Sequence, residues 1–335
     1  MRIPLGVVLG MAALAGACTT VTTTSDTAPD RPALVDHHVH AHAPSMLAFL
    51  PDYCSSMGRV GACPEVFVSP PPLEALLEQM QAAGVGRAHV MSSGYLAHSP
   101  MMVPARADAD ELVRDSNRYT VELARQSQGR LAAFISVNPN SASALTEIAY
   151  WGVNPGATGL KLHLTNSGVD LRDPDQLQQL GRVFAAANQA GLAITVHMRT
   201  RAPDYGAQDV NLFLDQVLTR APDVPVILAH AGGWGGLDAA TWRAMDAFAS
   251  AFEAGHPAVS KVYFELGQVY KADTPEADLE RLASLVRRIG VDRYLVGSDW
   301  PFSGNLDVYL NQTLYRLPLS PDEWKQIRLN RGLAQ

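Results

Sequence analysis

The sequence has no cluster of basic residues, and it carries more acidic than basic side chains. Its 335 residues include 26 lysines and arginines against 33 aspartates and glutamates, which gives a formal net charge of −7. Surfaces that bind nucleic acid are built on clustered positive charge. The composition therefore excludes an electrostatic basis for nucleic-acid binding, and 47% hydrophobic with 18% charged residues is typical of a globular protein.

A hydrophobic run long enough to span a membrane is also missing from the start of the chain. The apolar run from Leu5 to Ala17 has about 13 residues, whereas a membrane-spanning helix needs roughly 20. Because Arg2 precedes this run and small residues end it, we predict that residues 1–17 are an export signal peptide. Residues 18–30 are polar and Thr-rich and are expected to form a flexible tether, which leaves 31–335 as the folded domain.

Cysteine is scarce, with three residues in the chain. Cys18 follows Leu14-Ala-Gly-Ala, which resembles a bacterial lipoprotein box, so we expect a lipid anchor at Cys18; ordinary cleavage after Ala17 is the alternative. The protein is thus expected to be exported, either to the periplasm or to a membrane that it contacts only through this anchor. An oxidising compartment favours a disulfide between Cys54 and Cys63, and two free thiols are the alternative.

The sequence lacks the glycine-rich turn that an open doubly wound sheet usually carries after its first strand. Instead, strands and amphipathic helices alternate to the end of the chain. The predicted strands are 35–40, 87–92, 131–137, 158–164, 193–198, 224–230, 259–266 and 293–298. The predicted helices are 72–83, 108–128, 141–151, 174–190, 207–220, 237–254, 274–289 and 321 to the end. Eight strands, each followed by a helix, predict a (β/α)8 TIM barrel.

Side chains that can bind metal stand at the ends of these strands. On the first strand, Val35-Asp-His-His-Val-His40, side-chain alternation places His38 and His40 on one face. Later strands end in Gly159-Leu-Lys-Leu-His163, Ile194-Thr-Val-His197, Val226-Ile-Leu-Ala-His230 and Leu295-Val-Gly-Ser-Asp299. In TIM barrels the chemistry lies at the carboxyl ends of the strands. Several imidazoles and a carboxylate that meet there suit zinc or manganese.

Each of these residues also has a structural interpretation. His197 or His230 alone could be a hydrogen-bonded core histidine, and Asp299 could cap the turn that follows it. Lys161 could be a buried cation paired with Glu265 on the seventh strand. The metal count, one or two ions, stays open.

Taken in order, the motifs resemble those of the amidohydrolase superfamily, and more closely its amidohydrolase-related branch, from Val35 to about Asn330. They are Val-Asp-His-His-Val-His, Gly-Leu-Lys-Leu-His, Thr-Val-His, Leu-Ala-His-Ala-Gly-Gly and Gly-Ser-Asp-Trp-Pro. The resemblance implies a metal site at the barrel mouth made of His38, His40, Lys161, His197, His230 and Asp299. It implies that Lys161 is carboxylated if two metals bind. It also implies catalytic roles for Asp299, which moves a proton, and for His230, which binds a second metal or polarises the substrate.

The expected function is that of a metal-dependent hydrolase, in which a metal-activated water cleaves an amide, ester or lactone bond of a small molecule. A metal-dependent nonoxidative decarboxylase of a carboxylic acid is the alternative, because the same branch contains both chemistries. A noncatalytic metal-binding lipoprotein is a third interpretation, and a closed coordination sphere would favour it.

Residues near the predicted site suggest how a substrate is bound. Arg199 and Arg201 follow His197 and could clamp a carboxylate or phosphate, unless they form surface ion pairs with Asp204 or Asp209. Trp234 lies in a run of glycines that could form a lid or simply pack. His163 is expected to line the substrate pocket. The sequence predicts neither the substrate nor the oligomeric state.

Overall fold

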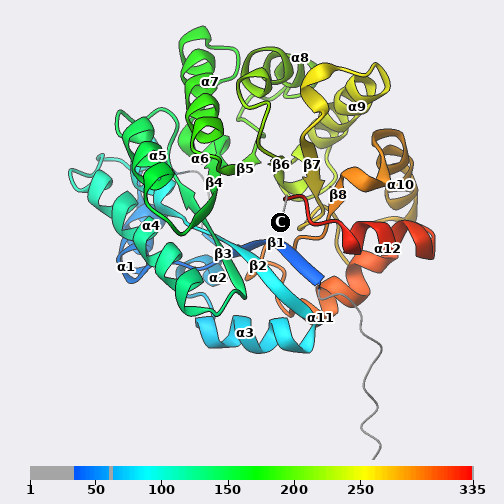
Figure 1. Cartoon of the computed structure of the whole chain (residues 1–335), viewed down its shortest axis with the longest axis horizontal. Helices are drawn as coiled ribbons and strands as arrows, with labels where there is room; N and C mark the ends of the chain where they lie inside the picture. Colours follow the sequence, from blue (N-terminus) through cyan, green and yellow to red (C-terminus); the bar gives the residue numbers. More distant parts are fainter. Residues whose placement is uncertain (1–33, 60–62, 334–335) are drawn as a thin grey trace, which may run out of the picture. The chain divides into compact units, whose positions relative to one another are not determined.

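The computed structural model describes residues 34–59 and 63–333, so the predicted signal peptide, the tether and Cys18 lie outside the described residues. Eight parallel strands follow one another in chain order around a single sheet, with helices outside it (Figure 1). The strands are β1 (Leu34–His40), β2 (Val85–Met91), β3 (Leu131–Ser136), β4 (Ala157–His163), β5 (Ala193–His197), β6 (Val226–Leu228), β7 (Val262–Glu265) and β8 (Tyr294–Leu295). The predicted (β/α)8 TIM barrel is confirmed.

The barrel closes where β1 meets the segment that follows β8. The backbone N–H of His37 donates to the carbonyl of Val296 at 2.9 Å, and that of Asp299 donates to His38 at 2.8 Å. His40 N–H donates to the carbonyl of Trp300 at 2.7 Å. Regular β8 is only two residues long, shorter than the predicted 293–298, because the chain beyond it bends along β1. These bonds place Asp299 beside the two histidines of β1.

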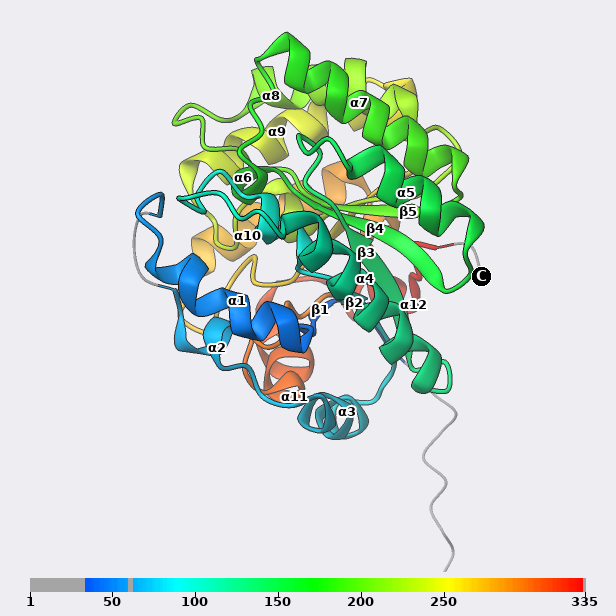
Figure 2. The same cartoon turned by 90° about the vertical axis from the view of Figure 1, so that its left-hand side faces the viewer.

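Helices fill the connections between the strands. They are α1 (Pro44–Ser55), α2 (Glu65–Val68), α3 (Leu73–Ala82), α4 (Ala109–Gln126), α5 (Ala144–Val153), α6 (Leu164–Ser167), α7 (Pro174–Gln189), α8 (Ala207–Leu212), α9 (Ala239–Glu253), α10 (Glu276–Ile289), α11 (Leu306–Val308) and α12 (Pro321–Leu329). The sequence did not predict α1, α2, α6 or α11. Seen from two directions, α11 lies beside α3, so a helix that follows β8 packs against a helix of the connection between β1 and β2 (Figures 1 and 2). In the described part of the chain, no helix has the length and apolar character needed to cross a membrane.

Helix α7 shows how local sequence sets these elements. The Asp173 carboxylate accepts hydrogen bonds from the backbone N–H groups of Asp175 and Gln176, which caps the first turn. The residues at helical spacing that form its buried face are Leu177, Leu180, Val183, Phe184 and Ala187. Just beyond its end, Gly191 takes a φ of 66°, a conformation that glycine adopts without strain. A cap, an apolar face and a glycine stop together fix this helix between β4 and β5.

The last helix ends earlier than predicted. Helix α12 stops at Leu329, and the side-chain amide of Asn330 then donates to the carbonyl of Tyr294 at 3.1 Å. The Nε2 atom of His37 lies 2.8 Å from the carbonyl oxygen of Arg331. Asn330 and His37 thus hold the end of the described chain against the barrel, and the prediction of a helix to the last residue was wrong.

A disulfide joins Cys54 at the end of α1 to Cys63, with the two Cα atoms 5.6 Å apart, which confirms the predicted pairing. We expect a variant with both cysteines changed to serine to lose about 2–3 kcal/mol of unfolding free energy, because the crosslink restricts the unfolded chain. Urea unfolding with and without dithiothreitol checks this. Dithiothreitol should destabilise the wild type and leave the variant unchanged. Equal stability of wild type and variant in the absence of dithiothreitol would contradict the expectation.

Candidate metal centre

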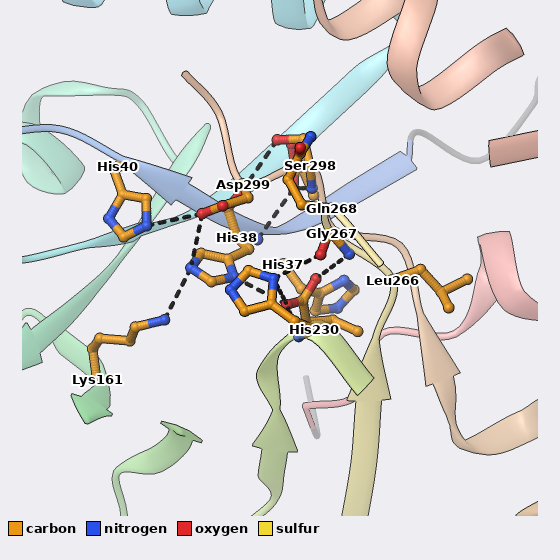
Figure 3. Close-up of polar contacts among 12 residues, drawn as sticks. His37, His38, His40, Lys161, His230, Leu266, Gly267, Gln268, Ser298 and Asp299 are labelled. Carbon is orange, nitrogen blue, oxygen red and sulfur yellow. Dashed lines mark hydrogen bonds and ion pairs between the residues drawn. The ribbon is translucent and has the colours of Figure 1, made fainter. Parts of the chain in front are cut away.

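Four predicted site residues meet in one buried cluster at the carboxyl ends of the strands (Figure 3). His40 Nε2 lies 3.1 Å from Asp299 Oδ1, and His38 Nε2 lies 3.5 Å from the same oxygen. The amine of Lys161, which comes from β4 across the barrel, lies 2.9 Å from His38 Nε2. The alternation on β1 therefore brings His38 and His40 to one side of the strand, as predicted.

The backbone at Asp299 is held in an uncommon conformation. Its φ is 60°, in the left-handed region that aspartate tolerates better than most residues. The Asp36 carboxylate anchors this loop, because its Oδ1 accepts from the N–H of Ser298 at 2.9 Å and from that of His38 at 3.1 Å. Burial raises the pKa of Asp36 to about 7. Asp36 is thus a structural link between β1 and the loop after β8.

Glu265, at the end of β7, is the site residue that sequence reasoning assigned only as an alternative partner for Lys161. Its Oε1 accepts from His38 Nδ1 at 3.1 Å and from the backbone N–H of His230 at 2.6 Å, and its Oε2 accepts from the N–H of Gly267. The carboxylate is fully buried, and this burial raises its pKa. Lys161 contacts His38, and no ion pair joins it to Glu265 in the described residues. An acidic residue at the end of a predicted strand was the available signal.

Two glycines leave room for this carboxylate. A Cβ atom at Gly267 or at Gly297 would lie within 3.0 Å of Glu265 Oε2. Larger residues at either position would push the carboxylate away from its donors. The backbone that follows β7 and β8 is therefore shaped around Glu265.

Hydrogen bonds fix which ring nitrogens carry protons. Because a carboxylate only accepts, His38 donates to Glu265 from Nδ1 and keeps its Nε2 lone pair toward Lys161 and Asp299. His230 donates from Nδ1 to the carbonyl of Gly267 at 2.7 Å, which leaves its Nε2 lone pair free. In proteins, metal-binding histidines are commonly oriented by a hydrogen bond from the ring nitrogen that does not bind the metal. The His38 and His230 rings thus present the form that a metal requires.

His197 lies at the end of β5 but outside the tightest donor groups. Among the described residues, the sets of three or more donor atoms within 4.8 Å of one another are His38, His40 and Asp299, and His38, His230 and Glu265. The ring centroid of His197 lies 5.2 Å from that of His230, and its Nδ1 is buried without a hydrogen-bond partner. His197 therefore adjoins the cluster through His230.

The residues present fit a divalent metal. Burial lowers the pKa values of His38, His40 and His197, so these imidazoles are neutral, as metal binding requires. Neutral imidazoles with one carboxylate suit zinc or manganese. Burial also lowers the pKa of Lys161 to about 8. In the structure its amine occupies the His38 lone pair, so a metal bound there would compete with Lys161.

A cavity of about 600 Å³ opens above the cluster, and all three predicted substrate-binding residues, Arg199, His163 and Trp234, line it. Arg199 pairs with Asp238 at 2.6 Å and lies over the Trp234 ring, 5.8 Å from its centroid. The sequence had proposed Asp204 or Asp209 as partners, but both carboxylates pair with Arg172 instead. Arg201 lines the same cavity, and its guanidinium contacts the sulfur of Met101.

Metal content tests this site directly. We expect metal-loaded wild type to retain zinc or manganese through gel filtration, and His38→Ala and His40→Ala to retain almost none, because each removes a ligand atom. His98→Ala, which removes a histidine outside the cavity, is the matched control and should bind like the wild type. Elemental analysis of the protein peak gives the ratio of metal to chain. Full metal content in His38→Ala would contradict the assignment.

The same measurement on Lys161→Ala decides the metal count. A carboxylated Lys161 that bridges two ions predicts a fall from two metals to one when bicarbonate is present during loading. A mononuclear site predicts one metal in both proteins. Neither result depends on knowing the substrate.

Comparison with known proteins places this site in a family. The amidohydrolase family model matches residues 35–327, and no match is found among curated proteins. The chain is similar in structure to 5-carboxyvanillate decarboxylase from Sphingomonas paucimobilis, with 16% identity over 89% of this chain and 96% of that one and a TM-score of 0.62. It is also similar to a zinc-bound amidohydrolase from Burkholderia multivorans, with 18% identity over 89% and 96% of the two chains and a TM-score of 0.56. A 2,6-dihydroxybenzoate decarboxylase from Rhizobium gives 15% identity, 88% and 96% coverage and a TM-score of 0.56. These structural likenesses show the fold. Because the family model spans nearly all of the described barrel, the chain belongs to the amidohydrolase family.

Proposed function

We propose that this protein is a metal-dependent enzyme that releases carbon dioxide from a small carboxylic acid without an oxidant. The charge of the cavity wall carries this proposal. Its lysine and arginine side chains are Arg59, Lys161, Arg199, Arg201 and Lys271, whereas Asp299 is its one carboxylate among the described residues. Such a wall in a chain of net charge −7 selects an anion. The substrate of a decarboxylase always carries a carboxylate, whereas an ester, amide or lactone need not.

Two groups of aromatic rings that line the cavity suit a flat substrate. In one group, the rings of His163 and Tyr95 lie 5.4 Å apart. In the other, Phe302 lies 5.9 Å from His40 and 6.0 Å from Phe67. Aromatic walls stack well on planar conjugated molecules. A conjugated substrate would also supply the electron sink that loss of carbon dioxide needs.

The chemistry can be divided among the cavity residues. A divalent metal held by His38, His40 and Asp299 would supply positive charge that binds and polarises the substrate. The guanidinium of Arg199 at the rim would orient the anionic group. When the carbon–carbon bond breaks, its electron pair passes to the substrate carbon, which must then take a proton. Asp299 is the carboxyl group placed to deliver this proton, which it would first take up from solvent in the cavity.

The comparisons support decarboxylation without deciding it. The similar structures from Sphingomonas paucimobilis and Rhizobium are described as decarboxylases, while that from Burkholderia multivorans is described as an amidohydrolase with bound zinc.

Hydrolysis of an amide, ester or lactone is the second candidate, and the state of Asp299 favours it. Burial raises the pKa of this carboxyl, but the hydrogen bond from His40 and the positive charge of Lys161 outweigh burial and hold the pKa below its usual value. Asp299 is therefore ionised at neutral pH. An ionised carboxylate is ready to accept a proton from water, which is the first need of a hydrolase.

Product analysis separates the two candidates. Metal-loaded protein is incubated with a panel of aromatic carboxylic acids labelled with ¹³C at the carboxyl carbon, and with a parallel panel of esters, amides and lactones. We expect labelled carbon dioxide and the matching decarboxylated compound, with no turnover in His38→Ala. Release of acid from the second panel, with no carbon dioxide from the first, would replace decarboxylation by hydrolysis.

A further inference from the structure

We propose that His163 forms a second anion-binding position in the cavity, and that the substrate carries a second acidic group beside the reacting carboxylate. This inference rests on the proposed function in one respect, namely that the substrate is an anion. It is carried by the proton position on the His163 ring and by unmatched charge in the cavity wall.

The His163 ring is held by two neighbouring rings and at one edge. It stacks on His197 with ring centroids 3.9 Å apart and an interplanar angle of 11°, and the Tyr95 ring lies 5.4 Å away. Its Nδ1 accepts a hydrogen bond from the backbone N–H of Asn166 at 3.3 Å. A backbone amide only donates, so the lone pair is on Nδ1 and the proton of the neutral ring is on Nε2.

The turn that follows β4 locks this arrangement. The hydroxyl of Ser99 donates to the carbonyl of Asn166 at 2.6 Å. The hydroxyl of the neighbouring Thr165 donates to the carbonyl of Arg199. One turn therefore positions both the His163 ring and the backbone of Arg199, which stand at the ends of adjacent strands.

The protonated edge of His163 is available to a ligand. The residue is partly exposed and lines the cavity, and in residues 34–59 and 63–333 no hydrogen bond reaches its Nε2. In this tautomer Nε2 carries the proton, so His163 offers the cavity a hydrogen-bond donor for a substrate oxygen.

The neighbouring charges indicate that this oxygen is anionic. The positive charge of Arg199 is already neutralised by an ion pair, in which its Nη1 lies 2.6 Å from Asp238 Oδ2. Arg201 and Lys271 have no carboxylate within 4.0 Å among the described residues. A substrate with one carboxylate, bound over the metal-binding residues, would leave these two charges unmatched. A second acidic group that accepts from His163 would lie in the same cavity as these two charges.

Ligand binding to zinc-loaded protein tests the inference without turnover. The probe is benzene-1,3-dicarboxylate, with benzoate as its one-carboxylate control, measured by calorimetry. His163→Phe removes the donor and keeps a ring that can stack on His197. A hydrogen bond to a charged group is worth about 10-fold or more in affinity. We expect His163→Phe to bind the dicarboxylate about 10-fold more weakly and benzoate within about twofold of the wild type.

Two further variants make the result specific. His98→Phe changes a histidine outside the cavity and should alter neither affinity, while His163→Gln, which restores an N–H donor, should recover part of the loss. Zinc content should be unchanged in all three variants. Equal weakening of both ligands, or loss of zinc in His163→Phe, would overturn the inference.

A spectroscopic measurement checks the proton position even if a variant folds poorly. In zinc-loaded wild type with ¹⁵N-labelled histidine, the His163 signals are assigned by their absence in His163→Gln. We expect the proton on Nε2, and a proton on Nδ1 would overturn the inference. Failure of carbon dioxide release would refute the proposed function but leave the binding and spectroscopic results intact. Carbon dioxide release without dicarboxylate discrimination would refute this inference alone.

Discussion

Replacement of Asp299 by asparagine is expected to lower kcat by about 10²- to 10⁴-fold, the range of a general acid or base. The carboxyl is the acidic group of the cavity wall, and it touches His40 at 3.1 Å. Asparagine has nearly the same shape, but it can neither take up nor release a proton at neutral pH. The loss should appear with whichever substrate the product analysis identifies, because both candidate reactions move a proton through this residue.

The asparagine variant should nevertheless fold. Asparagine also tolerates the left-handed region that the φ of 60° at Asp299 requires. Rates are measured at saturating metal and divided by bound metal, which separates loss of the proton carrier from loss of a ligand. Asp292→Asn, at the opposite end of β8, is the matched control and should keep the wild-type kcat. An Asp299→Asn protein that keeps more than one tenth of kcat per bound metal would remove the proton-carrying role.

The sequence contained enough information to predict the barrel and much of the centre, because both depend on local patterns. A two-residue period places His38 and His40 on one face of β1, and the parallel strand order brings Lys161 to the same mouth. These inferences need only strand geometry and the rule that parallel strands of a barrel end together. The cysteine pairing likewise followed from the predicted export and the short separation of the two residues.

The parts that the sequence did not predict depend on contacts between distant segments. Glu265 accepts from His38, which lies 227 positions away in the chain, and a lone acidic residue at a strand end does not reveal which histidine it will meet. The early end of α12 depends on the bond from Asn330 to Tyr294. Arg199 reaches Asp238 and not the nearer Asp204, because Arg172 from another connection already holds that carboxylate. In each case tertiary contacts chose among partners that the sequence leaves equivalent.

Glu265→Gln should weaken metal binding by about 10- to 100-fold, the usual cost of losing a second partner of a metal-binding histidine. Glutamate accepts from His38, from His230 N–H and from Gly267 N–H, whereas glutamine has one acceptor oxygen. Its amide nitrogen must therefore face a donor. Where it faces His38, that ring is driven to carry its proton on Nε2, the nitrogen that the metal needs.

The same change should cost about 1–3 kcal/mol of unfolding free energy, since it leaves a buried donor unsatisfied. Glu147→Gln is the matched control: Glu147 is also buried, and its Oε1 accepts from Asn117 at 3.0 Å and from Trp151 at 2.8 Å, with no contact to the metal-binding histidines. The amide oxygen of this variant can still accept from both donors, so the variant should keep most of its stability and bind metal like the wild type.

Gly297→Ala provides a second route to the same effect, because its new Cβ would displace the Glu265 carboxylate without changing its chemistry. We expect this variant also to bind metal more weakly than the wild type. Chelator competition gives the metal affinities and urea unfolding gives the stabilities. If Glu265→Gln loses stability but binds metal as well as Glu147→Gln does, Glu265 supports only the fold. A loss of metal affinity confined to Glu265→Gln and Gly297→Ala would show that Glu265, at the end of β7, orients the His38 ring of β1 for metal binding.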